Sequence, residues 1–310
     1  MEHRSLVIIG GGPAGLTAAI YAMRSGLDVL LVEKGAPGGQ INSTSDVENW
    51  PGLKQVSGFD LAQSLQHHAE HVGAEIRTAE LTAVDFSGKR KILATDKGSI
   101  SSDAVILCTG ARHRPLGVPG EAALTGRGVS YCAVCDGPFF RNEDVVVVGG
   151  GNSAAEEAEF LTRFASRVFM VHRRNKLRAA DMLARRVLAN PKIEMVWDSV
   201  VASINGKTGV QSVSVRNCIT GEARTLAATG VFIFVGTDPN SGMFRGSALE
   251  MSPEGWIQVD DRDLKTSVPG VFAAGDVRET SLRQVVTAAG DGARAAMSAY
   301  AYLAGLQDGM

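Results

Sequence analysis

Two cysteines stand three residues apart in the segment Cys132-Ala133-Val134-Cys135-Asp136-Gly137-Pro138. Cysteines at this spacing can close a disulfide that opens and reforms, and in an α/β protein the pattern indicates redox chemistry. Half of a zinc site is the alternative, but it needs a second close pair, and the remaining cysteines, Cys108 and Cys218, are isolated. Asp136 could give a proton to a departing thiolate, although a turn residue before glycine and proline is also typical at this position.

The other residues that could bind metal have simpler interpretations. Cys108 ends an apolar run, and we expect both it and Cys218 to be packed in the core. His67, His68 and His71 share one predicted helix, but no carboxylate lies between them as in metalloproteases. We therefore expect a solvated helix face there, and no metal site.

Two glycine-rich turns, Gly10–Gly15 and Gly149–Ala154, each follow an apolar run and open an alanine-rich helix. In this setting the first glycine makes the tight turn and the second lets the backbone approach a pyrophosphate. The last residue, Gly15 or Ala154, allows close helix–strand packing, and the phosphate lies at the helix N-terminus. A glycine turn without a ligand is the alternative, but two turns framed alike favour two dinucleotide sites.

The first site is acidic where the next predicted strand ends. Glu33 lies 23 residues after Gly10, and its carboxylate can accept a hydrogen bond from a ribose 2′-hydroxyl but would repel a 2′-phosphate. The first site therefore suits FAD or NAD.

The second site is basic at the equivalent place. His172 lies 23 residues after Gly149 and is followed by Arg173, Arg174 and, four residues on, Arg178. Guanidinium groups match a phosphate dianion, so this site suits NADPH; a solvated basic loop is the alternative.

The elements that must carry these residues occur twice in the same order. The first copy comprises strand 6–9, a helix to Ser25 capped by Gly26, strand 29–32, helix 58–72, a β-meander with turns at residues 87–88 and 97–98, and strand 104–107. The second comprises strand 145–148, a helix to about residue 164, strand 168–171, another helix, another meander and strand 231–235. The repeat predicts an α/β fold with two Rossmann-like, three-layer nucleotide-binding domains, each with a β-meander.

Two segments rich in proline and glycine, 114–120 and 236–242, have the composition of linkers. The 65 or so residues after the second are too few for a third ordinary domain, so we expect them to return to the first. This predicts a discontinuous domain of residues 1–113 and 246–310, with residues 114–245 inserted as the second domain.

Composition excludes several classes of protein. The 310 residues are 45% hydrophobic and 21% charged with a net charge of −2, which gives no global attraction to nucleic acid or to an anionic membrane. Four cysteines are too few for a disulfide-stapled secreted scaffold, and neither end has a targeting signal. No apolar run is long enough to span a membrane, so we expect a cytoplasmic protein.

With these residues in view, the chain resembles the bacterial low-molecular-weight thioredoxin reductases over nearly its full length. The similar segments are 10–15, 33–40, 47–52, 109–111, 132–137, 149–154, 172–174 with Arg178, 270–277 and 283–285.

The resemblance implies tightly but non-covalently bound FAD, with Asp276 on the ribityl chain and Arg283–Val285 near the isoalloxazine. The implied FAD residues are Gly10, Gly12, Pro13, Ala14, Gly15, Glu33, Lys34, Gly38, Gly39, Gln40, Asn49, Thr109, Gly110, Ala111, Gly275, Asp276, Arg283, Gln284 and Val285. The NADPH residues are Gly151, Asn152, Ser153, His172, Arg173, Arg174 and Arg178.

By the same resemblance, the activity is NADPH-dependent thioredoxin-disulfide reduction. Hydride passes from NADPH to FAD, the Cys132–Cys135 disulfide is reduced, and the dithiol exchanges with the disulfide of thioredoxin. Cys135 would face the flavin, Cys132 would attack thioredoxin, and Asp136 would act as general acid. The resemblance also implies a homodimer, and a rotation of domain 114–245 about the two linkers.

Other functions use part of the same constellation. A flavin dithiol oxidase would not need the arginine cluster, and a flavin reductase for peroxiredoxin would usually carry an extra N-terminal CxxC domain. A non-catalytic redox sensor or nucleotide-binding scaffold would not need both cysteines and both nucleotide sites.

Overall fold

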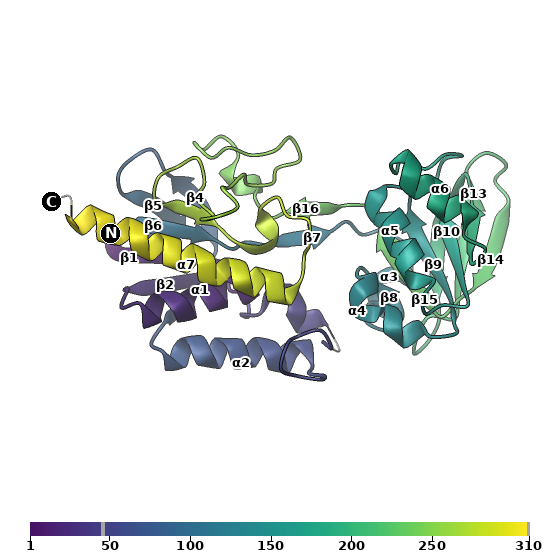
Figure 1. Ribbon diagram of the computed structural model, residues 1–310, viewed down its shortest axis with the longest axis horizontal. Coiled ribbons are helices and arrows are strands. Elements are labelled where there is room, and N and C mark those ends of the chain that lie inside the picture. Colours follow the sequence, from purple (N-terminus) through teal and green to yellow (C-terminus); the bar gives the residue numbers. More distant parts are fainter. Residues whose placement is uncertain (45–46, 309–310) are drawn as a thin grey trace. The chain divides into compact units, whose positions relative to one another are not determined.

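The computed structural model describes residues 1–44 and 47–308. The chain divides into two compact units, one formed by Met1–Arg112 with Asp238–Met310 and the other by His113–Thr237 (Figure 1). Each is built on a largely parallel sheet with helices against it, so the predicted α/β class with two Rossmann-like domains is confirmed.

The first unit is organised around a seven-stranded sheet with the order β3-β2-β1-β6-β5-β4, and β17 also pairs with β6. Its strands are β1 (Glu2–Ile9), β2 (Val29–Glu33), β3 (Glu75–Thr78), β4 (Leu81–Asp85), β5 (Lys91–Thr95), β6 (Gly98–Leu107) and β17 (Val271–Ala273). Its helices are α1 (Pro13–Arg24), α2 (Gly58–His71), α7 (Val285–Asp308) and the short 3₁₀ turns η1 (Gly39–Ser43), η3 (Gly242–Phe244) and η4 (Gly275–Val277). The apolar run Leu6–Ile9 is buried on both faces, as continuous apolar strands are in parallel sheets.

Helices α1 and α7 lie side by side on one face of this sheet (Figure 1). Their contact is close because small residues meet in it: a Cβ atom added at Gly292 would lie 2.1 Å from the Ala14 carbonyl oxygen. This packing brings the start of α7 against the start of α1, where the first glycine turn lies.

One prediction for this unit was wrong in detail. The third strand of the meander and the buried strand 104–107 are a single ten-residue strand, β6. Residues 98–102 of β6 pair antiparallel with β5, whereas residues 105–107 pair parallel with β17, so one strand serves both parts of the sheet.

The second unit repeats the plan with a five-stranded parallel sheet, order β11-β10-β9-β15-β8, and a separate antiparallel sheet, order β12-β13-β14. The strands are β8 (Val129–Ser130), β9 (Asp144–Gly149), β10 (Arg167–Val171), β11 (Ile193–Val196), β12 (Ser199–Asn205), β13 (Ser212–Asn217), β14 (Ala223–Ala227) and β15 (Gly230–Phe234). The helices are α3 (Glu121–Leu124), α4 (Ala133–Asp136), α5 (Asn152–Leu161), α6 (Asp181–Ala189) and the 3₁₀ turn η2 (Gly137–Phe140). Helix α5 ends three residues earlier than predicted, in a hydrogen-bonded turn over residues 162–164.

The chain crosses between the units twice, and the crossing strands β7 (Ala111–His113) and β16 (Thr237–Pro239) pair with each other. The structure assigns residues 238–245 to the first unit, whereas the sequence placed them in the second. The reason is Phe244, which is fully buried in the first unit's core 6.5 Å from the ring of Phe86.

The isolated cysteines differ from each other. Cys108 is buried, as predicted, and burial raises the pKa of its thiol far above the ordinary value. Cys218 is exposed, so the prediction of core packing was wrong for it: it lies in the turn after β13, where its N–H donates to the Asp198 carbonyl at 2.6 Å. The three histidines of α2 are exposed, as predicted.

Over residues 1–44 and 47–308, no group of three or more histidine, cysteine and acidic side chains is arranged to hold a metal ion. Within the same ranges, no helix combines the length and apolarity needed to cross a membrane.

Candidate active site

The first glycine turn is shaped by contacts that only glycine permits. Gly10 has φ +103°, and a Cβ there would lie 2.3 Å from the Cys108 carbonyl oxygen; at Gly15 it would lie 1.8 Å from the Gly10 carbonyl oxygen. At Gly12, by contrast, a Cβ would meet no atom within 4 Å. The turn is therefore closed against β6 and open at Gly12, beside the N-terminus of α1, where a diphosphate can approach.

Glu33, at the end of β2, is held against this turn. One carboxylate oxygen accepts a hydrogen bond from the Gly11 N–H at 2.7 Å, and the other accepts one from the Gly35 N–H at 2.9 Å. Each oxygen keeps a further lone pair, so the carboxylate can still accept a ribose hydroxyl.

Two buried polar atoms in the first unit, the Thr109 hydroxyl oxygen and the Arg283 Nε, have no hydrogen-bond partner among the residues that the structure describes. Gly110 has φ +67° and open space on its Cβ side, and the Arg283 guanidinium lies 4.2 Å over the Trp256 ring. Buried polar groups are nearly always paired, so these two atoms indicate a polar ligand. They fit a flavin nucleotide, which offers both donors and acceptors.

Asp276 lies in η4, and burial raises the pKa of its carboxyl to about 6, against the opposing effect of the Arg283 charge. A carboxyl in this state can either accept or donate a hydrogen bond near neutral pH.

Two further predicted residues are fixed by side-chain hydrogen bonds. Gln40 donates to the Ala111 carbonyl at 2.8 Å, and Asn49 donates to the Gln284 side chain at 3.0 Å.

The redox pair lies in the second unit, directly after β8. Cys132 and Cys135 form a disulfide with their Cα atoms 5.3 Å apart. Cys132 is the N-cap of α4, and its sulfur accepts a hydrogen bond from the Cys135 N–H at 3.2 Å. The fully buried Ala133 anchors the short helix, whereas Val134 beside the pair is 41% exposed.

The second glycine turn is closed on one side and open on the other, like the first. Gly149 has φ +152°, and a Cβ there would lie 2.5 Å from the Phe234 carbonyl oxygen. At Gly151 it would meet nothing within 4 Å. At Gly150 it would meet the His172 ring at 2.2 Å, which shows that His172 lies directly beneath the turn.

His172 therefore differs from the arginines that follow it. It is 5% exposed, its Nε2 bonds the Lys176 carbonyl at 3.1 Å, and burial lowers the pKa of its imidazole. A neutral, buried ring supports the turn from below, whereas the guanidinium groups are the exposed charges.

Arg173, Arg174 and Arg178 are exposed, and none of the three pairs with a carboxylate in the described part of the chain. The Arg178 N–H donates to the Gly150 carbonyl at 2.7 Å, which ties the basic loop to the glycine turn. Unpaired guanidinium groups beside an open glycine turn suit a phosphorylated ribose.

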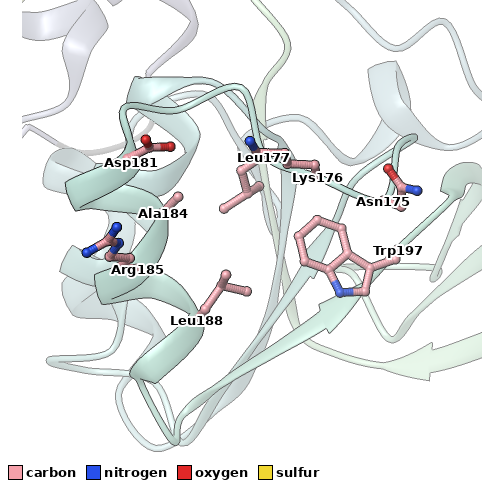
Figure 2. Close-up of a pocket in the computed structure, with 8 residues that line it drawn as sticks. All are labelled: Asn175, Lys176, Leu177, Asp181, Ala184, Arg185, Leu188 and Trp197. Carbon is pink, nitrogen blue, oxygen red and sulfur yellow. The ribbon is translucent and has the colours of Figure 1, made fainter.

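A pocket of about 250 Å³ adjoins this basic loop (Figure 2). It is lined by Asn175, Lys176, Leu177, Asp181, Ala184, Arg185, Leu188 and Trp197. Figure 2 shows the Trp197 ring facing the open space opposite Leu188 of α6. The Trp197 ring also lies edge-on to the His172 ring, with 6.3 Å between the ring centres. One wall of the pocket therefore contacts the histidine that supports the glycine turn.

The structure gathers the predicted residues into two groups. The first unit holds the proposed flavin residues at the carboxyl ends of β1, β2 and β6 and around η4, and the second unit holds the arginines and the redox pair. Sequence reasoning missed three residues in the first unit: Trp256 under Arg283, and the buried pair Arg278 and Asp291. It also missed Glu157. Its buried Oε2 has no hydrogen-bond partner within the described ranges, and burial raises the pKa of its carboxyl to about 7.

Comparison with known proteins decides the family. Residues 4–292 match the family model described as pyridine nucleotide-disulphide oxidoreductase. The chain belongs to this family. Its members use a pyridine nucleotide and a flavin, which agrees with the two glycine turns and the disulfide.

Within the family, the chain is similar to thioredoxin reductases. It is 47% identical over 310 residues to the thioredoxin reductase of Streptomyces clavuligerus (99% of this chain, 96% of the relative). It is 46% identical to that of Bacillus subtilis (98% and 96%). Among solved structures, the thioredoxin reductase of Streptococcus pyogenes matches with a TM-score of 0.93 at 48% identity (98% and 99%). That of Giardia duodenalis matches with a TM-score of 0.94 at 40% identity (98% and 100%).

Proposed function

We propose that this chain is an NADPH-dependent thioredoxin-disulfide reductase with non-covalently bound FAD. The observation that carries the proposal is the Cys132–Cys135 disulfide, set in a unit that also bears an open glycine turn and three exposed arginines that pair with no carboxylate of the described residues. The similarity to thioredoxin reductases over nearly the whole chain supports thioredoxin as the protein substrate.

In the first unit, we assign FAD to the turn Gly10–Gly15, to Glu33, and to the segments around Thr109 and Asp276. Bound there, the flavin supplies two-electron transfer between a nicotinamide and a disulfide. Glu33 accepts a ribose hydroxyl, and Thr109 and Arg283 offer their unpaired polar atoms to the ring system or its side chain.

In the second unit, the open glycine Gly151 admits the NADPH diphosphate, and the arginines hold its 2′-phosphate. The charges of Arg174 and Arg178 both act on the buried His172 beneath the turn, so both lie near the turn. NADH lacks the 2′-phosphate and loses these bonds, which is the basis of the proposed preference.

The disulfide performs the exchange with the protein substrate. Two electrons and two protons convert the Cys132–Cys135 disulfide into two thiols, with Asp136 proposed as the proton donor to one departing thiolate. The Cys135 N–H that now bonds the Cys132 sulfur would stabilise a Cys132 thiolate. That thiolate attacks the thioredoxin disulfide, and Cys135 then attacks Cys132 in the mixed disulfide and releases reduced thioredoxin.

The proposed nicotinamide site and the disulfide both belong to the second unit, yet each must reach the flavin in turn. We propose that this unit rotates about its two crossings, near residues 113 and 237, between hydride transfer and dithiol exchange. We also propose a homodimer, carried over from the resemblance, and a cytoplasmic location. A crosslink between the units should halt thioredoxin turnover, and undiminished turnover would exclude the rotation.

The test of the proposed function is NADPH-driven reduction of purified thioredoxin by the purified protein, with NADH as the comparison. We expect NADPH to be the better donor and reduction to require both nucleotide and flavin. Flavin reduction by NADPH without thioredoxin turnover would favour a redox sensor instead.

A further inference from the structure

A buried ion pair lies in the first unit, outside the residues assigned so far. Asp291, on the second turn of α7, accepts hydrogen bonds from Arg278 at 2.6 Å (Nε to Oδ2) and 3.1 Å (Nη2 to Oδ1). The side chains are only 10% and 8% exposed for Arg278 and Asp291. Burying two charges costs folding free energy, so the buried position of this ion pair requires an explanation.

The same carboxylate also holds the backbone of the proposed flavin segment. The Gly275 N–H donates to Asp291 Oδ2 at 3.2 Å. Asp291 therefore ties two points of the segment that leads from β17 to α7, its start at Gly275 and its middle at Arg278. Asp276, the proposed ribityl contact, lies between these two points.

Asp291 also lies close to the first glycine turn. The next residue, Gly292, packs on the Ala14 carbonyl, and a Cβ at Gly275 would lie 3.0 Å from the Ala14 Cβ. The Asp291 charge also raises the pKa of Cys108, the residue whose carbonyl packs on Gly10. One carboxylate thus lies where η4, α1 and the end of β6 meet.

We propose that Asp291 is a positioning residue for the flavin, which holds the Gly275–Asp276 backbone in its binding geometry with Arg278 as its charge partner. The inference rests on the proposed flavin site and adds two residues to it. Neither needs to touch the flavin. Supporting residues of this kind hold the ligand-binding groups in place. Their loss weakens ligand binding because those groups are then misplaced.

The test must separate positioning from stability, because removing one member of a buried pair leaves an uncompensated charge. Two double variants remove both charges: Arg278→Met with Asp291→Asn, and Arg278→Met with Asp291→Leu. They differ in whether residue 291 can still accept the Gly275 N–H. Asp261→Asn is the matched control, since Asp261 bonds the outer side of Arg278 at 3.0 Å but is 89% exposed.

The readout is release of FAD from the diluted holoenzyme, monitored by the recovery of flavin fluorescence. Urea unfolding of the FAD-free proteins is measured in parallel, because bound FAD itself adds to the unfolding free energy. We expect the leucine double variant to bind FAD at least tenfold more weakly than the asparagine double variant at similar unfolding midpoints. The control should stay within twofold of the wild type. A difference in FAD affinity below tenfold between the two double variants would overturn the inference. So would a loss of FAD affinity that follows the unfolding midpoints. Failure of the wild type to bind FAD would instead refute the proposed function.

Discussion

The arginines beside the second glycine turn set the proposed preference for NADPH, and changing two of them tests this assignment. Arg174 and Arg178 are exposed, unpaired with any carboxylate among the described residues, and close enough to His172 to lower the pKa of its imidazole. Their replacement by glutamine removes the charge and keeps much of the side-chain length.

The expected rise in the KM for NADPH follows from the exposure of the two arginines. A hydrogen bond to a charged group contributes about 1.5–3 kcal/mol, and screening at an exposed site reduces this to about 1.4 kcal/mol, a factor of about 10. Each variant should therefore raise the KM for NADPH about tenfold. The double variant should raise it about 100-fold if the two bonds are independent.

NADH separates this reasoning from a general loss of fold, since it carries no 2′-phosphate. Its KM should change by less than about twofold in the same variants, because no arginine bond is lost. Arg185→Gln is the matched control: Arg185 is also exposed but lies on α6, in the wall of the pocket. Steady-state assays with both nucleotides decide the matter, and equal losses for NADPH and NADH would refute the assignment.

Three further predictions concern stability and flavin binding. Burial raises the pKa of Glu157 to about 7, so the wild type should lose about 2 kcal/mol more unfolding free energy than Glu157→Gln as the pH rises from about 4.5 to 7, after allowance for partial exposure. Urea unfolding should show that Glu157→Gln lacks this loss and that the exposed Glu156→Gln keeps most of it; equal pH profiles for Glu157→Gln and the wild type would contradict the assignment. Gly15→Ala should destabilise the protein by about 3 kcal/mol because its Cβ would lie 1.8 Å from the Gly10 carbonyl oxygen. Gly12→Ala should retain the unfolding midpoint of the FAD-free protein yet bind FAD at least tenfold more weakly, since its methyl fills only the proposed diphosphate space; unchanged FAD binding would argue against that space being the site.

The sequence could predict the two glycine turns and the charges at the following strand ends because their physics is local. A tight turn that needs positive φ or close approach requires glycine at fixed spacing, and both turns fold as expected. The residue 23 positions after the first glycine is the last residue of the adjacent strand in the first unit and directly follows that strand in the second. This is why Glu33 and His172 both lie at their turns.

What the sequence could not predict depends on contacts between distant segments. β6 could not be recognised as one strand, because its two halves pair with different partners, β5 and β17. The exposure of Cys218 depends on where the turn after β13 falls, and residue type alone favours burial.

The buried polar residues were missed for a related reason. Arg278 and Asp291 are ordinary surface types, and they come together because α7 packs against η4 and the residue that follows it. The first unit was predicted to resume at residue 246, but it resumes at residue 238. Segment 236–242 has the composition of a linker, and this gave no sign that Phe244, just after it, belongs to the first unit's core.

The central claim is that the Cys132–Cys135 disulfide carries electrons from NADPH to thioredoxin. The most direct test compares NADPH-driven thioredoxin reduction by the wild type with that of Cys132→Ser and Cys135→Ser, while flavin bleaching by NADPH is followed separately. We expect both variants to keep NADPH-dependent flavin reduction and to lose thioredoxin turnover. Full thioredoxin turnover in either variant would contradict the account.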